Sequence, residues 1–222
     1  MQGLLFHVPT GMLAAVIEDR KTKTRRLGGL KKVNKKPDDW AFVGFDEMSE
    51  GKFEAAFKKK DDKEGYTTVH CKPRLKKGEV VYVKESYHFN GYNNIYKVDA
   101  SEDSLARVKK KNLFKWSNAM FCPHTDKKTG LQVARTFLKI KSIHVERLND
   151  ITKEDCIKEG IGVVDIVGGV EYFGTRATAF YKDPRAAFME LIDKINKKGT
   201  AKNNPFVFVY EFEKTASGDC NR

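Results

Sequence analysis

The chain has 222 residues and a mass of 25.3 kDa, which fits one domain with large insertions or two small domains. Its 15 Phe, 8 Tyr and 2 Trp can fill a core, so wholesale disorder is excluded. No stretch approaches the roughly 18–20 uncharged apolar residues of a membrane-spanning helix. The net charge of +12 favours a polyanionic partner: nucleic acid, nucleotide or a membrane surface.

Cysteine usage and the first residues indicate a cytoplasmic protein. No two of the four cysteines have C-x-x-C spacing, and the start of the chain lacks the basic and apolar regions of a secretory signal. Two Cys/His pairs could supply zinc ligands, but their spacing matches no established zinc pattern, so no metal or other cofactor is expected. These residues are His70, Cys71, Cys122 and His124.

The first predicted helix runs from about Gly11 to Arg20, with Thr10 as its cap. Nine basic residues and no acidic one follow between Arg20 and Lys36. Such a run is usually a solvated arm, but its first half begins directly at the helix end and contains two interleaved threonines. Residues 28–39, rich in Gly and Lys, are expected to form an inserted loop.

Strands are predicted at residues 40–45, 52–57, 66–71, 79–87, 116–122, 131–148 and 206–212. In the cleanest of them Val81, Val83 and Glu85 share one face. The Glu85 carboxylate therefore either lies at the mouth of the core, faces a pocket or pairs with a cation. Alternation changes phase near Lys141 in the long strand, which suggests a bulge or bend.

Two later helices have clear start signals. Thr152 and Asp155 form a capping-box variant, and this helix is expected to end at Gly160, which leaves Glu159 at its unfavourable C-terminal end. Asp183 followed by Pro184 begins the other helix. Its predicted buried face consists of Phe188, Leu191, Ile192 and Ile195.

About eight strands with three helices predict a mixed α+β fold around a small, mostly antiparallel β-barrel with flanking helices and inserted loops. The first strand, near residue 5, could pair with the last, near residue 209, and so close the barrel. The tail from residue 215 is expected to fray.

Several motifs, in this order, resemble the ASCH domain family, a branch of the PUA-like barrels, and especially its larger members encoded by bacteriophages. They lie at residues 20–26, 77–87, 135–146, 150–155, 159–161 and 204–212. The resemblance implies a single PUA-like domain over residues 1–214, with insertions at about 27–39, 46–70 and 88–130 and a frayed tail at 215–222. If the chain is phage-encoded, its location is the host cytoplasm.

The resemblance also implies an activity. PUA-like barrels generally bind RNA or modified bases, and a small bacterial ASCH protein hydrolyses the amide of N4-acetylcytidine with a Lys, a Thr and a Glu. Lys21 and Thr24 match its K-x-x-T pair, and Glu159 matches its glutamate. The greater length and the basic arm of this chain are departures from that enzyme, and they leave the substrate open.

The proposed chemistry is consistent with the residue types. A threonine hydroxyl needs a base to become a nucleophile, and a lysine serves if burial or neighbouring cations lower its pKa. Basic residues surround Lys21 in the sequence, so a lowered pKa is expected. We therefore assign Thr24 as nucleophile, Lys21 as base and Glu159 as the positioning acid, with Glu85 as the substitute carboxylate.

Other residues are candidates for substrate binding. Trp116 and Tyr87 could stack on a base or form part of a core or cleft wall. Arg25, Arg26 and Arg135 could hold phosphate or pair with Glu85 and other acids.

Two functions follow: an amidohydrolase acting on an acylated pyrimidine nucleoside, or a non-catalytic RNA- or DNA-binding module that uses a basic cleft. A phage protein that acts on modified DNA or blocks a host factor is a third. The expected partner is a modified nucleoside or a nucleic acid, with RNA favoured over DNA and no membrane. The oligomeric state stays open.

Overall fold

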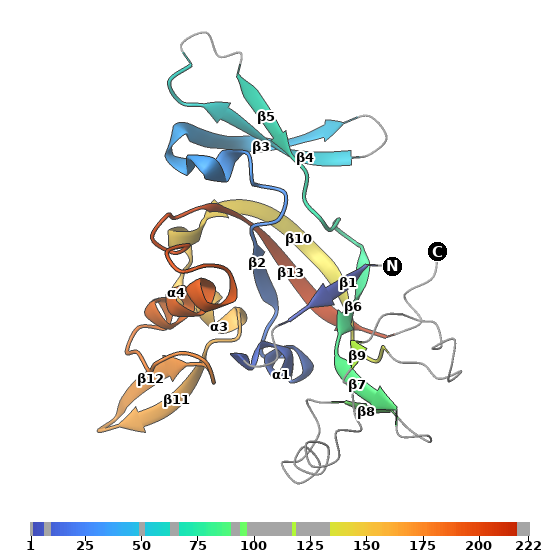
Figure 1. Cartoon of the computed structure of the whole chain (residues 1–222), viewed down its shortest axis with the longest axis vertical. Coiled ribbons are helices and arrows are strands. Elements are labelled where there is room, and N and C mark those ends of the chain that lie inside the picture. Colours follow the sequence, from blue (N-terminus) through green and yellow to red (C-terminus); the bar gives the residue numbers. More distant parts are fainter. Residues whose placement is uncertain are drawn as a thin grey trace. The chain divides into compact units, whose positions relative to one another are not determined.

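The computed structural model describes the backbone of residues 2–6, 10–48, 52–62, 67–89, 94–96, 117–118 and 134–216. Strands in several sheets dominate, with few helices, so the predicted mixed α+β class is confirmed (Figure 1). The chain divides into two compact units. The first unit comprises Met1–Asp19, Val80–Lys139 and Glu213–Arg222, and the second comprises Arg20–Glu79 and Ile140–Phe212.

The first unit is built on strand β6 (Val80–Lys84), whose three central residues are buried. β1 (Gly3–Leu5) pairs with β6 in parallel, and the first three residues of β10 (Phe137–Arg147) pair with it antiparallel. A separate small sheet has the order β8 (Asn94–Tyr96), β7 (Ser86–Phe89), β9 (Ser117–Asn118). The predicted strand over residues 79–87 is therefore two strands, which meet at Glu85.

Helix α1 (Met12–Ile17) also belongs to the first unit, and its cap differs from the prediction. Gly11 is the N-cap, with a left-handed φ of 80°, and no side chain caps the helix. Thr10 is instead buried, at 2% exposure. The glycine takes the cap position because its backbone conformation is one that a β-branched residue adopts only with strain.

In the second unit, β13 (Phe206–Thr215) lies between β10 and β2 (Lys23–Arg26). Both faces of β13 are buried from Phe206 to Tyr210, so its apolar run is continuous rather than alternating. A second sheet has the order β3 (Trp40–Met48), β4 (Lys52–Lys59), β5 (Thr68–Cys71). An antiparallel hairpin joins β11 (Gly162–Val167) to β12 (Val170–Gly174).

The expected pairing of the first strand with the last is not found among the described strands, so the closed barrel stays a prediction. Among the described strands, β1 pairs with β6, whereas the sheet neighbours of β13 are β10 and β2 (Figure 1). The phase change predicted within β10 is reflected in its burial: Leu138 and Ile140 are buried at one parity and Val145 at the other.

The two later helices begin as predicted. Thr152 Oγ1 accepts a hydrogen bond from the Asp155 amide at the start of α3 (Lys153–Lys158), and Asp183 caps α4 (Pro184–Ile195). Gly160, at φ 97°, ends α3 in a Schellman motif, with backbone bonds from 160 to 157 and from 161 to 156. Ile195 does not belong to the buried face of α4, because it is 38% exposed in the last turn.

Residues 27–39 form a packed segment rather than a solvated loop. They include the short 3₁₀ helices η2 (Val33–Lys35) and η3 (Pro37–Asp39). Leu30 and Val33 are fully buried, and the Asn34 amide both donates to and accepts from the backbone of Phe206. The apolar residues within the lysine run therefore fasten the segment to the second unit, and a third 3₁₀ helix, η4 (Leu148–Asp150), follows β10.

Gly29 provides a test of this packing. Its φ is +91°, and a Cβ there would lie 2.3 Å from the Lys72 carbonyl oxygen. We expect Gly29→Ala to lower the free energy of unfolding by about 2–4 kcal/mol, from backbone strain plus overpacking. Gly28→Ala, which adds a methyl group in open space, should change it by about 0.5 kcal/mol or less. Urea unfolding measures both, and equal effects would contradict the close approach of residues 29 and 72.

Candidate functional site

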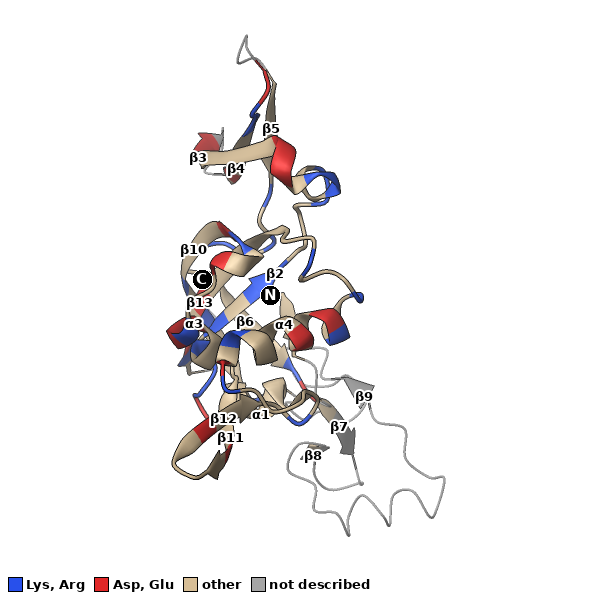
Figure 2. Ribbon diagram, turned by 90° about the vertical axis from the view of Figure 1, so that its left-hand side faces the viewer, with Lys and Arg blue, Asp and Glu red and all other residues tan. Residues whose placement is uncertain are grey.

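Strand β2 carries cations that alternate between two environments. Because successive side chains of a strand point to opposite faces, Lys23 and Arg25 share one face and Thr24 and Arg26 the other. Lys23 Nζ lies 2.8 Å from Asp155 Oδ1, so the first face is directed at α3. Figure 2 shows the basic residues of β2 in blue on the ribbon. Backbone bonds from Thr22 N to Lys158 O and from Phe212 N to Thr22 O hold the start of β2 between α3 and β13.

Arg25 forms ion pairs with three carboxylates, and its side chain is fully buried. Its nitrogens lie 2.6 Å from Glu146, 2.8 Å from Asp155 and 3.1 Å from Glu159. Burial alone would lower the pKa of Arg25, but the three carboxylates raise it above its ordinary value. Arg25 is therefore a permanent cation held by acids, which is the second of the roles anticipated for it, although Glu85 is not among its partners.

The same cation affects the carboxylates. Burial would raise the pKa of Glu146 and of Asp155, but the net direction is downward in both cases. For Glu146 the opposing groups are His144 and Arg25, and for Asp155 they are Lys23 and Arg25. Both acids therefore remain ionised at neutral pH.

Lys21 and Glu159 meet in a buried contact, as the sequence predicts. Lys21 Nζ lies 2.5 Å from Glu159 Oε2 and 2.5 Å from the Glu159 carbonyl oxygen, and both residues are 4% exposed. Burial is the largest influence on Lys21 and lowers its pKa; Glu159 opposes this, while Arg26 and Arg25 add to it. The predicted direction of the pKa shift is thus present, with burial rather than neighbouring charge as its first cause.

Thr24 is buried, at 4% exposure, on the other face of β2. It lies opposite Tyr210 of β13 in the antiparallel register, so these two side chains share a face. The Tyr210 hydroxyl accepts a hydrogen bond from the Arg74 amide at 3.0 Å. The structure therefore brings Lys21 and Glu159 into contact. Thr24, which follows Lys21 by three positions in the sequence, lies on the face of β2 that is next to Arg74.

Glu85 is paired in the first unit. The buried carboxylate accepts hydrogen bonds from Arg135 Nε and Nη2, at 3.1 and 2.8 Å, and from Thr136 Oγ1 at 2.9 Å. The Arg135 guanidinium stacks 3.8 Å from the centre of the Tyr96 ring. Of the alternatives for Glu85, pairing with a cation is confirmed. Lys21 is bound to Glu159.

No protein-family model, curated protein or solved structure matches this chain significantly. The ASCH resemblance therefore stays an expectation that depends on the motifs themselves.

Three further residues are predicted to bind substrate: Arg26, Tyr87 and Trp116. Burial lowers the pKa of Arg26, and the positive charge of Arg74 contributes to the same direction. The Tyr87 backbone belongs to β7, but its side chain is outside the description, as is all of Trp116. Cys122 and His124 are also outside it.

In the described ranges no three His, Cys, Asp or Glu residues are grouped to hold a metal ion, and no helix could cross a membrane.

Four residues of the site have roles that the sequence does not predict. Asp155 is predicted only as part of a helix cap, and no role is predicted for Glu146, Tyr210 or Arg74. The period-two pattern of residues 21, 23 and 25 could have indicated an acidic partner surface, but no local signal identifies which distant carboxylates supply it.

We expect Arg25→Met to lower the free energy of unfolding by about 3–5 kcal/mol at pH 7, because it leaves three carboxylates without their shared cation. The loss should shrink toward about pH 4. In the wild type, the lowered pKa values of Glu146 and Asp155 stabilise the fold above their ordinary values of 4.5 and 3.8, and this contribution disappears as pH falls through the folded values. In the variant these acids can take up protons sooner.

Urea unfolding at both pH values measures this effect. The matched control is Lys23→Met, which removes a single ion pair at a partly exposed position and should cost about 1 kcal/mol or less. Similar losses for the two variants would show that Arg25 does not hold the cluster together.

Proposed function

We propose that the chain is an ASCH protein with a PUA-like fold that removes an acyl group from a modified pyrimidine such as N4-acetylcytidine. The observation that supports this most directly is the buried contact of Lys21 with Glu159. Its lysine has a lowered pKa and lies three residues before a buried threonine. These are the residue types and the spacing that the resemblance implies, and the lysine and glutamate come from segments 138 positions apart.

In the proposed reaction, neutral Lys21 accepts the proton of Thr24 Oγ1 as that oxygen bonds to the acyl carbon. The tetrahedral intermediate then breaks its carbon–nitrogen bond, and the N4 amine leaves with the proton returned by Lys21. Water hydrolyses the acyl-threonine, with Lys21 again as base. Glu159 positions Lys21 throughout. Because Thr24 is 4% exposed, substrate binding requires movement of the groups that cover it.

The PUA-like arrangement of the strands, which is more specific than the α+β class, is part of the same proposal. The largest sheet contains strands from both ends of the chain, in the order β1, β6, β10, β13, β2. β10 pairs antiparallel with β6 and β13 pairs antiparallel with β2, whereas β1 runs parallel to β6. Mostly antiparallel pairing supports a PUA-like arrangement in which the sheet curls around its apolar face.

Replacement of the reacting groups tests the activity. We expect Lys21→Met and Thr24→Val to reduce deacetylation of N4-acetylcytidine by at least about 100-fold, since each removes the base or the nucleophile. Thr24→Ser, which keeps a hydroxyl, should retain more activity than Thr24→Val. Mass spectrometry of the nucleoside products measures conversion, and thermal unfolding checks that each variant is folded. Full activity of a folded Thr24→Val protein would exclude this mechanism.

The dependence of the rate on pH should identify Lys21 as the base. A base acts when neutral, so kcat/KM should rise as pH increases through the lowered pKa of Lys21 and then level off. Thr24→Ser should keep the same midpoint, because it leaves Lys21 and Glu159 unchanged. A rate that instead falls over this range would mean that Lys21 acts in its protonated form.

A non-catalytic nucleic-acid-binding module is the second candidate function. The observation that favours it is the net charge of +12, because a free nucleoside has no phosphate for that charge to bind. In this case RNA is the expected partner ahead of DNA, and no cofactor is required.

A further inference from the structure

Two basic segments of the second unit lie on the Thr24 side of β2. One is residues 28–36 and the other is residues 72–77; each contains four exposed cations and no acidic residue. We name them together the basic surface. Its cations are Lys31, Lys32, Lys35, Lys36, Lys72, Arg74, Lys76 and Lys77.

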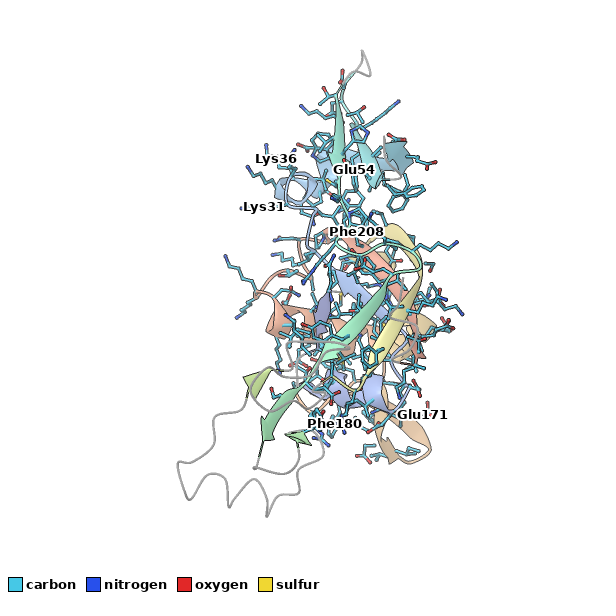
Figure 3. The ribbon with its side chains drawn as sticks, turned by 90° about the vertical axis from the view of Figure 1, so that its right-hand side faces the viewer. Lys31, Lys36, Glu54, Glu171, Phe180 and Phe208 are labelled. Atoms are coloured by element: carbon cyan, nitrogen blue, oxygen red, sulfur yellow. The ribbon has the colours of Figure 1, made fainter. Side chains whose placement is uncertain are left out.

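The two segments are adjacent in space although about 40 positions separate them. A Cβ on Gly29 would lie 2.3 Å from the Lys72 carbonyl oxygen and 3.2 Å from the Phe208 ring. Burial raises the pKa of the Cys71 thiol, and the Lys32 charge opposes that rise, so Lys32 also lies near the end of β5. Figure 3 shows Lys31 and Lys36 directed away from the ribbon.

The basic surface is connected to the candidate site through β13. The Arg74 amide donates to the Tyr210 hydroxyl, and Tyr210 is the register partner of Thr24. Phe208, which contacts the Gly29 position, is the register partner of Arg26. The face of β2 and β13 that carries Thr24 and Arg26 is therefore the face on which both basic segments lie.

The seven lysines of the basic surface differ from the cations on the other face of β2, which are paired with carboxylates. Lys23 and Arg25 are bound by carboxylates. By contrast, within the described part of the chain none of the seven lysines of the basic surface forms an ion pair. Of the nearby acids, Asp38 is paired with Arg147, and a Glu79 oxygen accepts from the Lys76 amide.

The side chains between these cations distinguish a phosphodiester strand from a lipid surface. Leu30, Val33 and Leu75 are buried, at 0 to 2% exposure, so the exposed part of the basic surface is cationic without large apolar groups. A cluster of cations alone can attract an anionic lipid surface, but the amphipathic segments that enter the lipid also carry exposed apolar side chains, which the basic surface lacks. A phosphate backbone requires only cations, so the composition of the basic surface favours a phosphodiester strand.

We propose that the basic surface binds the phosphodiester backbone of a nucleic-acid strand, and that the base processed at Thr24 is part of such a strand rather than a free nucleoside. The second half of this statement rests on the proposed function; the first half does not. Arg74 and Lys72 lie next to the Thr24 face, so phosphates that flank a target base would meet these cations first.

The test measures binding of a labelled single strand of about 20 nucleotides by fluorescence anisotropy between about 50 and 200 mM salt. RNA and DNA of the same sequence are compared, together with vesicles of phosphatidylcholine and phosphatidylserine. In one variant Lys31, Lys32, Lys35 and Lys36 are replaced by Gln, and in a second Lys72, Arg74, Lys76 and Lys77 are replaced. The control replaces Lys153, Lys197, Lys198 and Lys202, which are also exposed and give the same change in net charge.

We expect each basic-surface variant to weaken strand binding by about tenfold or more and to make the salt slope shallower by about 2, which corresponds to the loss of about three phosphate contacts. The control should change affinity by about twofold or less. Equal losses in all three variants would overturn the proposal in favour of diffuse attraction by net charge. Vesicle binding that exceeds strand binding would overturn it in favour of a lipid surface.

The outcomes for the surface and for the reaction are separable. If N4-acetylcytidine is hydrolysed but strand affinity does not depend on the basic surface, the proposed function stands and this inference fails. If strands bind through the basic surface and neither the nucleoside nor an N4-acetylcytidine-containing strand is deacetylated, the surface stands and the proposed function fails. Both hold if the basic-surface variants lose activity on the strand and keep it on the free nucleoside.

Discussion

The buried guanidinium of Arg25 is the interaction on which the second unit depends. It joins β2 to β10 through Glu146, to α3 through Asp155 and to the C-cap of α3 through Glu159. With Lys21 and Lys23, three cations oppose these three carboxylates, so the cluster is neutral. Neutrality matters because burial of an uncompensated charge costs several kcal/mol, whereas a balanced and hydrogen-bonded cluster can be accommodated.

Strand β2 consequently separates two kinds of electrostatic environment. Its Lys23 and Arg25 face is occupied by acids and is directed at α3, so it has little attraction left for an external anion. Its Thr24 and Arg26 face is shared with Tyr210 and Phe208 of β13, and it lies next to the segment of Arg74, beside exposed lysines that form no ion pairs in the described ranges. The basic run in the sequence is therefore divided between structure and binding by the alternation of one strand.

Local chemistry determined which predictions from the sequence were confirmed. Thr152, Gly160 and Asp183 mark helix ends through hydrogen bonds within a few residues, and Glu85 continues a buried alternation that required a cation. The cap at Thr10 was wrong because Gly11 adopts a left-handed conformation. The packing of residues 28–36 was missed because four lysines conceal the two buried residues Leu30 and Val33. Strand neighbours and the carboxylates of Arg25 depend on contacts between distant segments, for which a single sequence has no local signal.

The cluster also explains how Lys21 can change its charge inside the protein. A buried lysine paired with one carboxylate would leave that carboxylate uncompensated on losing its proton, which raises the cost of the neutral form. Glu159 differs because its other oxygen is bound to Arg25, 3.1 Å away, and Arg25 stays protonated. The neutral form of Lys21 therefore leaves Glu159 with a cationic partner, while burial and the nearby Arg26 disfavour the charged form. A base at this position and a structural cation four residues later are thus parts of one arrangement: Arg25 holds the carboxylate, and Lys21 is left able to exchange a proton.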